Sequence, residues 1–424
     1  MYKISSVEIN GFWQKYKIQS VFDSDVNIVI GMNGTGKTTF MNILYAVLSA
    51  DIDALFENDF SSVILKLSNG QNTKTIKAEK FENGSSPFPI IDYKISTRKY
   101  SLPVFSNDEA RALPTSLRRR AFEEAGKVKA ELEKLVSLAS LSVYRIGNEV
   151  DPEFRERTSK RSASPVDLRL ANLMQRLTHY QLELSTKARA VSSQLQRDVL
   201  TSLLYQKGAS DVRSATSSYD EANERNNLTT AYRQLGVSGT EITKKIQEHT
   251  GAINETLKKL KELEEGGFDE ASIENIDFSP LEAYRRTSRV IDLSLDAAKK
   301  IDLIYDQIQI FLAILHDFIP DKTFSLSSGD LSIEGNDDVT IPRLSSGEKQ
   351  LLILFIETLL QRKEPYIFLA DEPELSLHIS WQRKILPAIR KINENAQIVV
   401  ATHSPEVASN FVEKIIDMEN IRHV

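Results

Sequence analysis

Cysteine is absent from all 424 residues of the chain. This absence excludes a disulfide framework and any thiolate metal site, so a reducing cytoplasm is the simplest location. Long apolar runs are also lacking, since no uninterrupted stretch approaches the roughly 18 residues that a membrane span needs. The first residues, MYKISSVEINGF, alternate like a strand instead of showing the basic-then-apolar pattern of a secretory signal. The sequence therefore predicts a cytoplasmic protein without a membrane partner.

A global positive charge is lacking as well. The formal net charge is -6, so any surface that attracts nucleic acid must be local. Two clusters of basic residues could contact phosphates of DNA or RNA. A solvated face or a linker explains them equally well, and both readings stay open. The clusters are Arg118, Arg119 and Arg120, and further along Arg155, Arg157, Lys160 and Arg161.

A glycine-rich loop lies between a strand pattern and a helix pattern in VNIVIGMNGTGKTTF, residues 26–40. Its Gly31-x4-Gly36-Lys37-Thr38 spacing, in strand-loop-helix context, is typical of a phosphate-binding loop. Backbone N–H groups would point at the phosphates, Lys37 would reach the β- and γ-phosphates, and the Thr38 hydroxyl would ligate Mg²⁺. The residues we assign to ATP binding here are Asn33, Gly34, Thr35, Gly36, Lys37, Thr38 and Thr39.

Two further apolar runs end in polar side chains. YIFLADEPELSLH, residues 366–378, suits a central parallel strand that ends in two carboxylates. We expect Asp371 to hold Mg²⁺ through water and Glu372 to activate or orient the water that attacks the γ-phosphate. QIVVATHSPEV, residues 397–407, repeats the strand form and ends on His403. Because it follows the Asp-Glu strand by one helix, we expect His403 at the same edge of the sheet.

A third signal is RLSSGEKQ, residues 343–350, which precedes the helical run LLILFIETLL. Orphan N–H groups and the helix dipole make such an N-terminus a potential anion site. An ordinary serine N-cap is the alternative reading of the same residues.

Taken in this order, the four motifs resemble the ABC-type ATPases, and within them the SMC, RecF and OLD-like branch. The resemblance implies ATP and Mg²⁺ as cofactors, Glu372 and His403 as catalytic residues, and head-to-tail pairing of two copies. It also implies a homodimer or higher homo-oligomer joined through the ATP sites.

LSSGE, residues 344–348, is similar to the signature sequence of that family. The resemblance implies that Ser345 and Gly347, with their neighbours Ser346 and Glu348, bind the ATP held by the other subunit. His403 matches the switch histidine that senses the γ-phosphate.

The D-loop of the family falls on Ser376, Leu377 and His378, where His378 replaces an acidic residue common in transporters. The glutamine of the Q-loop has no clear place in this sequence.

The expected fold class is α/β. It is an ABC ATPase head, with a P-loop sheet and an antiparallel β-subdomain, split by a helical, short coiled-coil-like insertion. Short alternating runs near residues 2–9, 62–68, 74–80 and 89–96 indicate the antiparallel strands.

We expect three segments along the chain. Residues 1–150 form the N-terminal lobe, with a helical excursion at about 106–137, and residues 319–424 form the C-terminal lobe. Between them, residues 151–318 form the helical insertion, because apolar residues step by three and four along two long segments. Those residues are Leu170, Leu173, Leu177, Tyr180 and Leu184, and on the return Ala298, Ile301, Tyr305, Ile308, Leu312, Leu315 and Ile319.

Stand-alone heads of this size resemble the ATPase subunits of prokaryotic anti-phage systems such as Septu, PARIS and retrons. That resemblance implies an ATPase that controls a partner effector, a nuclease or toxin, in trans. Two alternatives stay open: a RecF-like DNA-repair clamp, and an ATP-gated scaffold with slow hydrolysis. The clamp predicts salt-sensitive DNA binding, and the scaffold predicts little turnover under any condition.

Overall fold

The computed structural model describes residues 1–81, 89–105, 115–142, 164–202, 219–266, 277–327, 329–334 and 340–423. The chain divides into two units. One comprises Met1–His179 and Ile308–Val424, and the other comprises Tyr180–Gln307. The first unit contains a five-stranded sheet, a seven-stranded sheet and a two-stranded hairpin, together with every residue predicted for the ATP site.

A five-stranded sheet forms the centre of the first unit, with the order β13-β3-β12-β11-β8. All four neighbouring pairs are parallel. Strands β11 and β12 are buried at every position, as expected of apolar runs covered on both faces. The bounds are β3 (Val26–Ile30), β8 (Leu138–Ser142), β11 (Tyr366–Asp371), β12 (Ala396–Ala401) and β13 (Ile415–Asp417).

The second sheet of this unit has seven strands in the order β14-β2-β1-β4-β5-β6-β7. Its pairs are antiparallel, and buried residues alternate with more exposed ones along β4 and β6. This confirms the predicted antiparallel subdomain. The bounds are β1 (Lys3–Phe12), β2 (Tyr16–Val21), β4 (Ser62–Ser68), β5 (Thr73–Phe81), β6 (Ile90–Ile95), β7 (Arg98–Pro103) and β14 (Arg422–His423).

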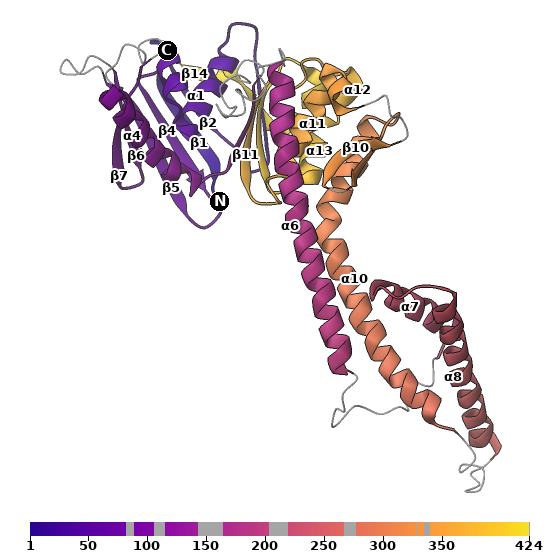
Figure 1. Ribbon diagram of the computed structural model, residues 1–424. Helices are drawn as coiled ribbons and strands as arrows, with labels where there is room; N and C mark the ends of the chain where they lie inside the picture. The colour runs from indigo at the N-terminus through magenta and orange to yellow at the C-terminus, as the bar shows by residue number, and fades with distance from the viewer. Residues whose placement is uncertain are drawn as a thin grey trace. The chain divides into compact units, whose positions relative to one another are not determined.

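Helix α1 (Lys37–Ser49) packs between the two sheets (Figure 1). Its Phe40, Ile43 and Leu44 share one apolar core with residues of both sheets. The buried Gln397 of β12 also joins the sheets. Its side chain accepts a hydrogen bond from the backbone N–H of Ile4 at 2.7 Å and donates to the Ile4 carbonyl at 2.7 Å. The start of α1 is therefore fixed relative to both sheets.

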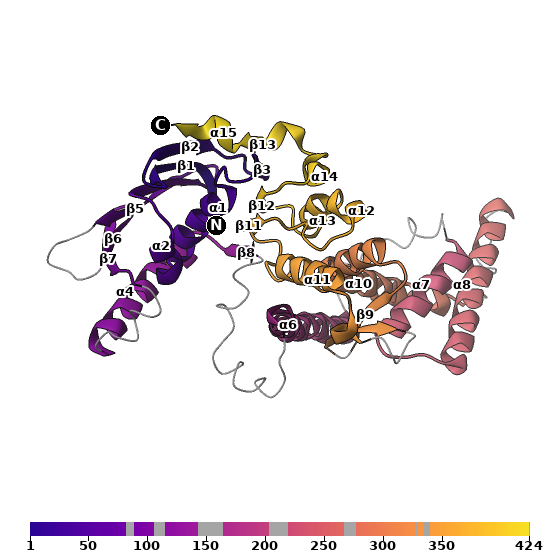
Figure 2. The same cartoon turned by 90° about the horizontal axis from the view of Figure 1, so that it is seen from above.

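The opposite face of the parallel sheet is covered by α11 (Ser346–Leu359) and α13 (Ile385–Ile392), as Figure 2 shows. A two-stranded hairpin, β9 (Thr323–Ser327) and β10 (Asp330–Glu334), stands apart from both sheets. The other helices of this unit are α2 (Ile52–Glu57), α4 (Thr115–Glu133), α12 (Ile379–Gln382), α14 (Pro405–Ala408) and α15 (Met418–Ile421), with 3-10 turns at Ile341–Arg343 and Val412–Lys414.

Two long helices carry the chain into and out of the second unit. They are α6 (Pro165–Ser202) and α10 (Ser279–Phe318). Within the second unit they run antiparallel, because Tyr180 donates a hydrogen bond to Gln307 at 3.0 Å while Tyr305 donates to Ser185 at 3.5 Å. The predicted apolar stripe of the first helix is buried at every position, and burying each leucine contributes about 2 kcal/mol.

Along the chain, α7 (Glu221–Gln234) and α8 (Thr240–Gly266) come between α6 and α10. They meet α10 in a small core of Leu228, Ala231, Ile246 and Ile291. The α/β class with a helical insertion is thus confirmed. The predicted lobe boundaries at residues 150 and 318 stay a prediction, and residue 150 lies outside the described segments. In the part of the chain that the structure describes, no helix is long and apolar enough to cross a membrane.

Candidate functional site

The carboxyl ends of β3, β12 and β11 lie side by side at one edge of the parallel sheet. Asp371 pairs with Ala401 across β11 and β12, and Ala401 pairs with Val29 across β12 and β3. The three loops that follow these strands therefore begin next to one another. They carry the glycine-rich segment, the two strand-end carboxylates and His403. The sequence predicts a common edge for the carboxylates and His403, and the structure adds the glycine-rich segment to it.

The glycine-rich loop curls between β3 and α1 in a backbone conformation that needs glycine. Gly36 has φ 99°, a left-handed value, and a Cβ there would lie 2.7 Å from the Phe12 ring. Asn33, Gly34 and Thr38 are exposed, whereas Thr35 is buried. The exposed backbone of the loop at the start of a 13-residue helix is suited to phosphate oxygens.

Lys37 places a buried ammonium group against this loop. The residue is only 5% exposed, and Nζ donates hydrogen bonds to the carbonyls of Gly31 at 2.8 Å and Met32 at 3.1 Å. Burial lowers the pKa of Lys37, and the nearby carboxylates of Glu372 and Asp371 act in the opposite direction. The positive charge of the loop thus lies within electrostatic reach of both strand-end acids.

Asp371 and Thr38 form a pair that fits Mg²⁺. The Thr38 side chain lies near enough to the Asp371 carboxyl to act on its pKa and lower it, while Asp371 Oδ1 is buried and has no hydrogen-bond partner among the described residues. Burial raises the pKa of Asp371, and repulsion from Glu372 and Glu374 adds to the rise. A divalent cation would compensate this buried charge, and a hydroxyl with a carboxylate is a donor set that Mg²⁺ accepts together with water and phosphate oxygens.

No group of three or more histidine or acidic side chains within the described segments is arranged to hold a metal by itself. Mg²⁺ in phosphate sites keeps several waters and is bound through one or two protein groups plus substrate phosphates.

Glu372 and His403 face each other across neighbouring loops. His403 Nε2 lies 3.7 Å from Glu372 Oε1, and the side chains are 38% and 30% exposed. Glu372 has a left-handed φ of 50°, and its backbone N–H donates to the Ala401 carbonyl at 2.8 Å. The turn aims Glu372 away from the direction of the strand. A carboxylate and an imidazole at this separation, both reachable by water, can orient a nucleophile and exchange a proton.

The helix α11 begins with a capping box. The Ser345 hydroxyl accepts a hydrogen bond from the backbone N–H of Glu348 at 3.3 Å, and Glu348 Oε2 accepts from the Ser345 backbone N–H at 2.8 Å. Glu348 also accepts from Lys322 at 2.7 Å. Burial alone would raise the pKa of Glu348, but Lys322 and Ser345 hold it below its usual value. Ser345 is thus a serine N-cap of α11. Ser345 and Ser346 are also exposed, and their role in binding an anion stays a prediction.

Gly347 has a packing role that its motif did not reveal. A Cβ at this position would lie 2.6 Å from the backbone carbonyl oxygen of Ser376, so any other residue would displace the loop after β11. Ser376 itself has a left-handed φ of 69°. Leu377 is buried, and the His378 side chain caps α12 by accepting from the Ser380 backbone N–H at 3.3 Å. The segment that resembles the D-loop is therefore packed against the start of α11.

Sequence reasoning missed two residues of this edge. Glu374 is 8% exposed and accepts hydrogen bonds from the loop that carries His403. Trp13 is 36% exposed, and its indole lies beside Gly36. A second acid within DEPE was the available signal for Glu374, whereas nothing in the local sequence placed Trp13 at the loop.

Other predicted features lie elsewhere. Arg119 and Arg120 are exposed on α4, where Arg119 pairs with Glu123 at 2.8 Å. The Arg118 side chain and the second basic cluster lie outside the described residues, as do residues 143–150, which follow β8.

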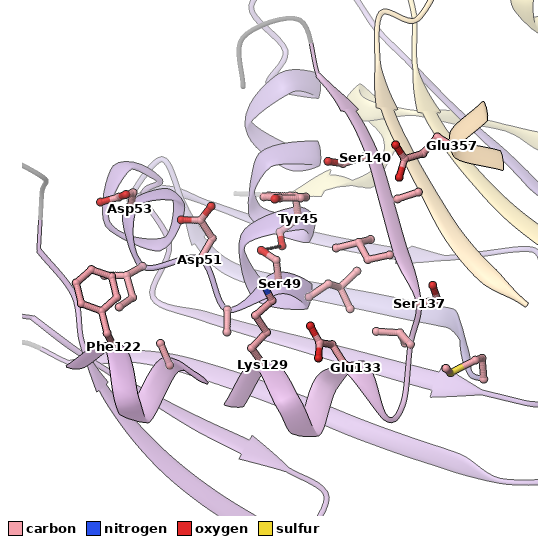
Figure 3. Close-up of a pocket in the computed structure, with 18 of the residues that line it drawn as sticks. Tyr45, Ser49, Asp51, Asp53, Phe122, Lys129, Glu133, Ser137, Ser140 and Glu357 are labelled. Atoms are coloured by element: carbon pink, nitrogen blue, oxygen red, sulfur yellow. Dashed lines mark hydrogen bonds between the residues drawn. The ribbon is translucent and has the colours of Figure 1, made fainter. Parts of the chain in front are cut away.

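A cavity of about 710 Å³ lies at the far end of α1 from the glycine-rich loop. Figure 3 shows Tyr45 and Ser49 of α1 facing Lys129 and Glu133 of α4, with Glu357 across the opening. None of the residues predicted to bind ATP lines it. Because α1 has 13 residues and rises 1.5 Å per residue, about 20 Å separates the two ends. The candidate site is the exposed loop edge and not this cavity.

Comparison with known proteins gives a family and a relative. Residues 2–408 match the family model described as AAA ATPase domain. A stretch of 104 residues is 36% identical to the protein named Retron Ec83 probable ATPase from Escherichia coli. That match covers 22% of this chain and 18% of the relative, so the chain spans less than a fifth of the relative's length.

Solved structures of SMC heads are similar over nearly the whole chain. The Smc head domain with an extended coiled coil, bound to the C-terminal domain of ScpA, from Pyrococcus furiosus is 14% identical, with a TM-score of 0.44 over 98% of this chain and 93% of that one. The SMC head domain from Thermotoga maritima is 12% identical, with a TM-score of 0.38 over 96% and 91% of the two chains.

Proposed function

Because the chain belongs to the AAA ATPase domain family, we propose that it binds ATP with Mg²⁺ and hydrolyses it to ADP and phosphate. One observation carries the proposal. The lysine and hydroxyl of a glycine-rich loop, two strand-end carboxylates and a histidine gather at one edge of the parallel sheet. Thr38 and Asp371 would hold Mg²⁺, which supplies charge neutralisation at the β- and γ-phosphates.

The side chains divide the work of hydrolysis. Lys37 would hold the β- and γ-phosphates, and the loop N–H groups would surround them. Glu372 would orient a water and take its proton as the water oxygen attacks the γ-phosphorus and the bond to the bridging oxygen breaks. His403, 3.7 Å from Glu372, would contact the γ-phosphate and orient that carboxylate. The exposed indole of Trp13 offers a flat surface for the purine ring beside Gly36.

We propose that two copies pair head to tail, so that Ser345, Ser346 and Gly347 of one copy meet the ATP of the other. Support comes from large apolar side chains on the loops around the site. Met32 is 70% exposed in the glycine-rich loop, and Ile379 is 62% exposed at the start of α12. Exposed apolar groups around a polar site are suited to burial by a second copy.

The relative's name suggests a setting for the ATPase. That protein is named a probable ATPase of a retron, and the motifs of this chain resemble those of ATPase subunits of anti-phage systems. We therefore propose that the ATP cycle senses infection or controls a nuclease or toxin that acts in trans.

The proposal is tested by measuring phosphate release by the purified chain with Mg²⁺ over about three decades of protein concentration. We expect Mg²⁺-dependent release whose rate per chain rises with concentration as copies pair, then levels off. A rate per chain that is constant from the lowest concentration would contradict the shared site. No release at any concentration would contradict hydrolysis and favour the scaffold alternative.

A further inference from the structure

Glu374 lies two residues after Glu372 and is turned into the protein. It is 8% exposed, and its Oε1 accepts three hydrogen bonds from consecutive residues of the neighbouring loop. The donors are the Thr402 hydroxyl, the His403 backbone N–H at 3.2 Å and the Ser404 backbone N–H at 3.3 Å. One carboxylate oxygen therefore contacts the whole segment that carries His403.

This segment has just left the sheet. Strand β12 ends at Ala401, and the Thr402 N–H still donates to the Val29 carbonyl at 3.1 Å. The next two N–H groups have no strand to pair with, and each buried backbone donor needs an acceptor. Glu374 is that acceptor for His403, and it shares the Ser404 N–H with the Thr402 hydroxyl, which accepts from the same group at 2.9 Å. The direction in which the His403 side chain leaves the backbone is thus fixed by Glu374.

A second chain of contacts supports the same segment from α12. The Ser404 hydroxyl donates to Gln382 Oε1 at 2.7 Å, and Gln382 Nε2 donates to the Leu377 carbonyl at 3.1 Å. The loop after β11 and the loop after β12 are therefore linked twice, once through Glu374 and once through Gln382. Among the residues that the structure describes, only the Glu374 link reaches the backbone N–H of His403.

Burying the carboxylate of Glu374 at this position costs free energy of folding. Glu374 Oε2 is buried and has no hydrogen-bond partner among the described residues, and the carboxylate repels Asp371. An apolar side chain would fill the space without an unpaired oxygen, so packing alone does not explain glutamate. What glutamate adds is an acceptor of sufficient length and strength for three donors.

We propose that Glu374 is a positioning residue for ATP hydrolysis. It holds residues 402–404 so that His403 Nε2 stays 3.7 Å from Glu372 Oε1, where the pair can act on the γ-phosphate and the attacking water. This inference rests on the proposed function, since it assigns a role within the same reaction.

Replacing Glu374 with alanine should lower kcat about 30- to 100-fold, because a misplacement of about 1 Å at a reacting group costs on the order of 100-fold. The KM for ATP should change less than about twofold, because the glycine-rich loop and Lys37 are untouched. Glu374→Gln keeps the length and one acceptor oxygen and should restore most of kcat. Glu374→Asp keeps the charge but is one methylene shorter and should stay impaired. Steady-state phosphate release measures all three.

A double variant separates positioning from general damage. If Glu374 acts through His403, then Glu374→Ala combined with His403→Ala should be no slower than His403→Ala alone. Effects that multiply would overturn the inference, as would Glu374→Ala at the wild-type kcat or Glu374→Gln as slow as alanine. Thermal melting shows whether the Glu374→Ala variant folds. If it does not, Thr402→Val serves in its place, because it removes one of the three donors to Glu374 and should lower kcat about threefold to tenfold. An unchanged kcat in that variant overturns the inference.

The same series distinguishes the two proposals. A wild-type chain that releases no phosphate refutes the proposed hydrolysis and this inference with it. An active wild-type chain whose Glu374 variants follow none of these patterns refutes the positioning role alone.

Discussion

Replacing Glu372 with glutamine should slow ATP hydrolysis at least about a hundredfold and leave ATP binding near the wild-type level. Glutamine keeps the size of the side chain and its place beside His403, but it cannot accept the proton of the attacking water. The backbone turn should persist, because the hydrogen bond from the Glu372 N–H to the Ala401 carbonyl does not involve the side chain. Phosphate release and titration with a fluorescent ATP analogue measure the two effects separately.

The same variant should accumulate as an ATP-bound pair, which size-exclusion chromatography with ATP detects. Mixtures of Glu372→Gln and wild-type chains then show whether the two sites act independently. Activity proportional to the wild-type sites indicates independence, and inactive mixed pairs indicate strict coupling. Turnover at the wild-type rate would make Glu372 a structural carboxylate, and the hydrolytic role would belong to another group.

Lys37→Ala should abolish detectable nucleotide binding while the chain still folds. The hydrogen bonds that Lys37 Nζ makes to described residues are to the carbonyls of Gly31 and Met32 in its own loop, so its removal breaks no hydrogen bond to the core. It removes the one basic side chain that the phosphate-binding motif supplies to the β- and γ-phosphates. The fluorescent ATP analogue should show no saturable binding. The melting temperature without nucleotide should stay within a few degrees of wild type, because a loss of 1 kcal/mol in the free energy of unfolding shifts it by about 2–4 °C or less in a chain of this size.

Lys37→Arg is the matched comparison for charge. Arginine keeps the positive charge but not the compact ammonium that fits the curled loop, so binding should remain weak. Binding of normal strength in Lys37→Ala would refute the assignment of the phosphate-binding loop.

Much of this edge could be predicted because its determinants are local. Strand patterns that end in polar residues indicate parallel strands, and parallel strands share one carboxyl edge. That rule brought Asp371, Glu372 and His403 to the edge where Lys37 lies, as the structure has them. Helical periodicity likewise identified the buried stripe of α6, from Leu170 to Leu184.

What could not be predicted depends on contacts between distant segments. The place of Trp13 follows from the β1–β2 turn, whose residues Trp13 and Gln14 adopt left-handed φ values of 52° and 59° against the preference of their side chains. The role of Glu374 depends on the order β3-β12-β11, which sets its loop beside residues 402–404. Gly347 meets Ser376 only once α11 and the loop after β11 have packed. No local pattern encodes these three contacts.

In the proposed head-to-tail pair, each ATP site is completed by a second copy. Ser345→Arg should leave ATP binding by its own loop nearly unchanged but block closure and hydrolysis at the site that this serine completes, because a bulky cation would stand at the exposed start of α11. The change also removes the cap, which costs about 1 kcal/mol. Ser345→Ala removes the same cap without the bulk, so equal melting temperatures of the two variants would show that cap loss is not what separates them.

Mixing Lys37→Ala chains with Ser345→Arg chains is the most direct measurement. In a mixed pair both lesions fall on one site and the other site is whole. Random pairing at equal concentrations makes about half of the pairs mixed, each with one whole site, so about a quarter of the wild-type phosphate release should return from two inactive proteins. The shared site would be contradicted by a mixture that contains mixed pairs, as native mass spectrometry shows, but is no more active than either variant alone. This outcome counts if mixtures of Glu372→Gln and wild-type chains show that the two sites act independently.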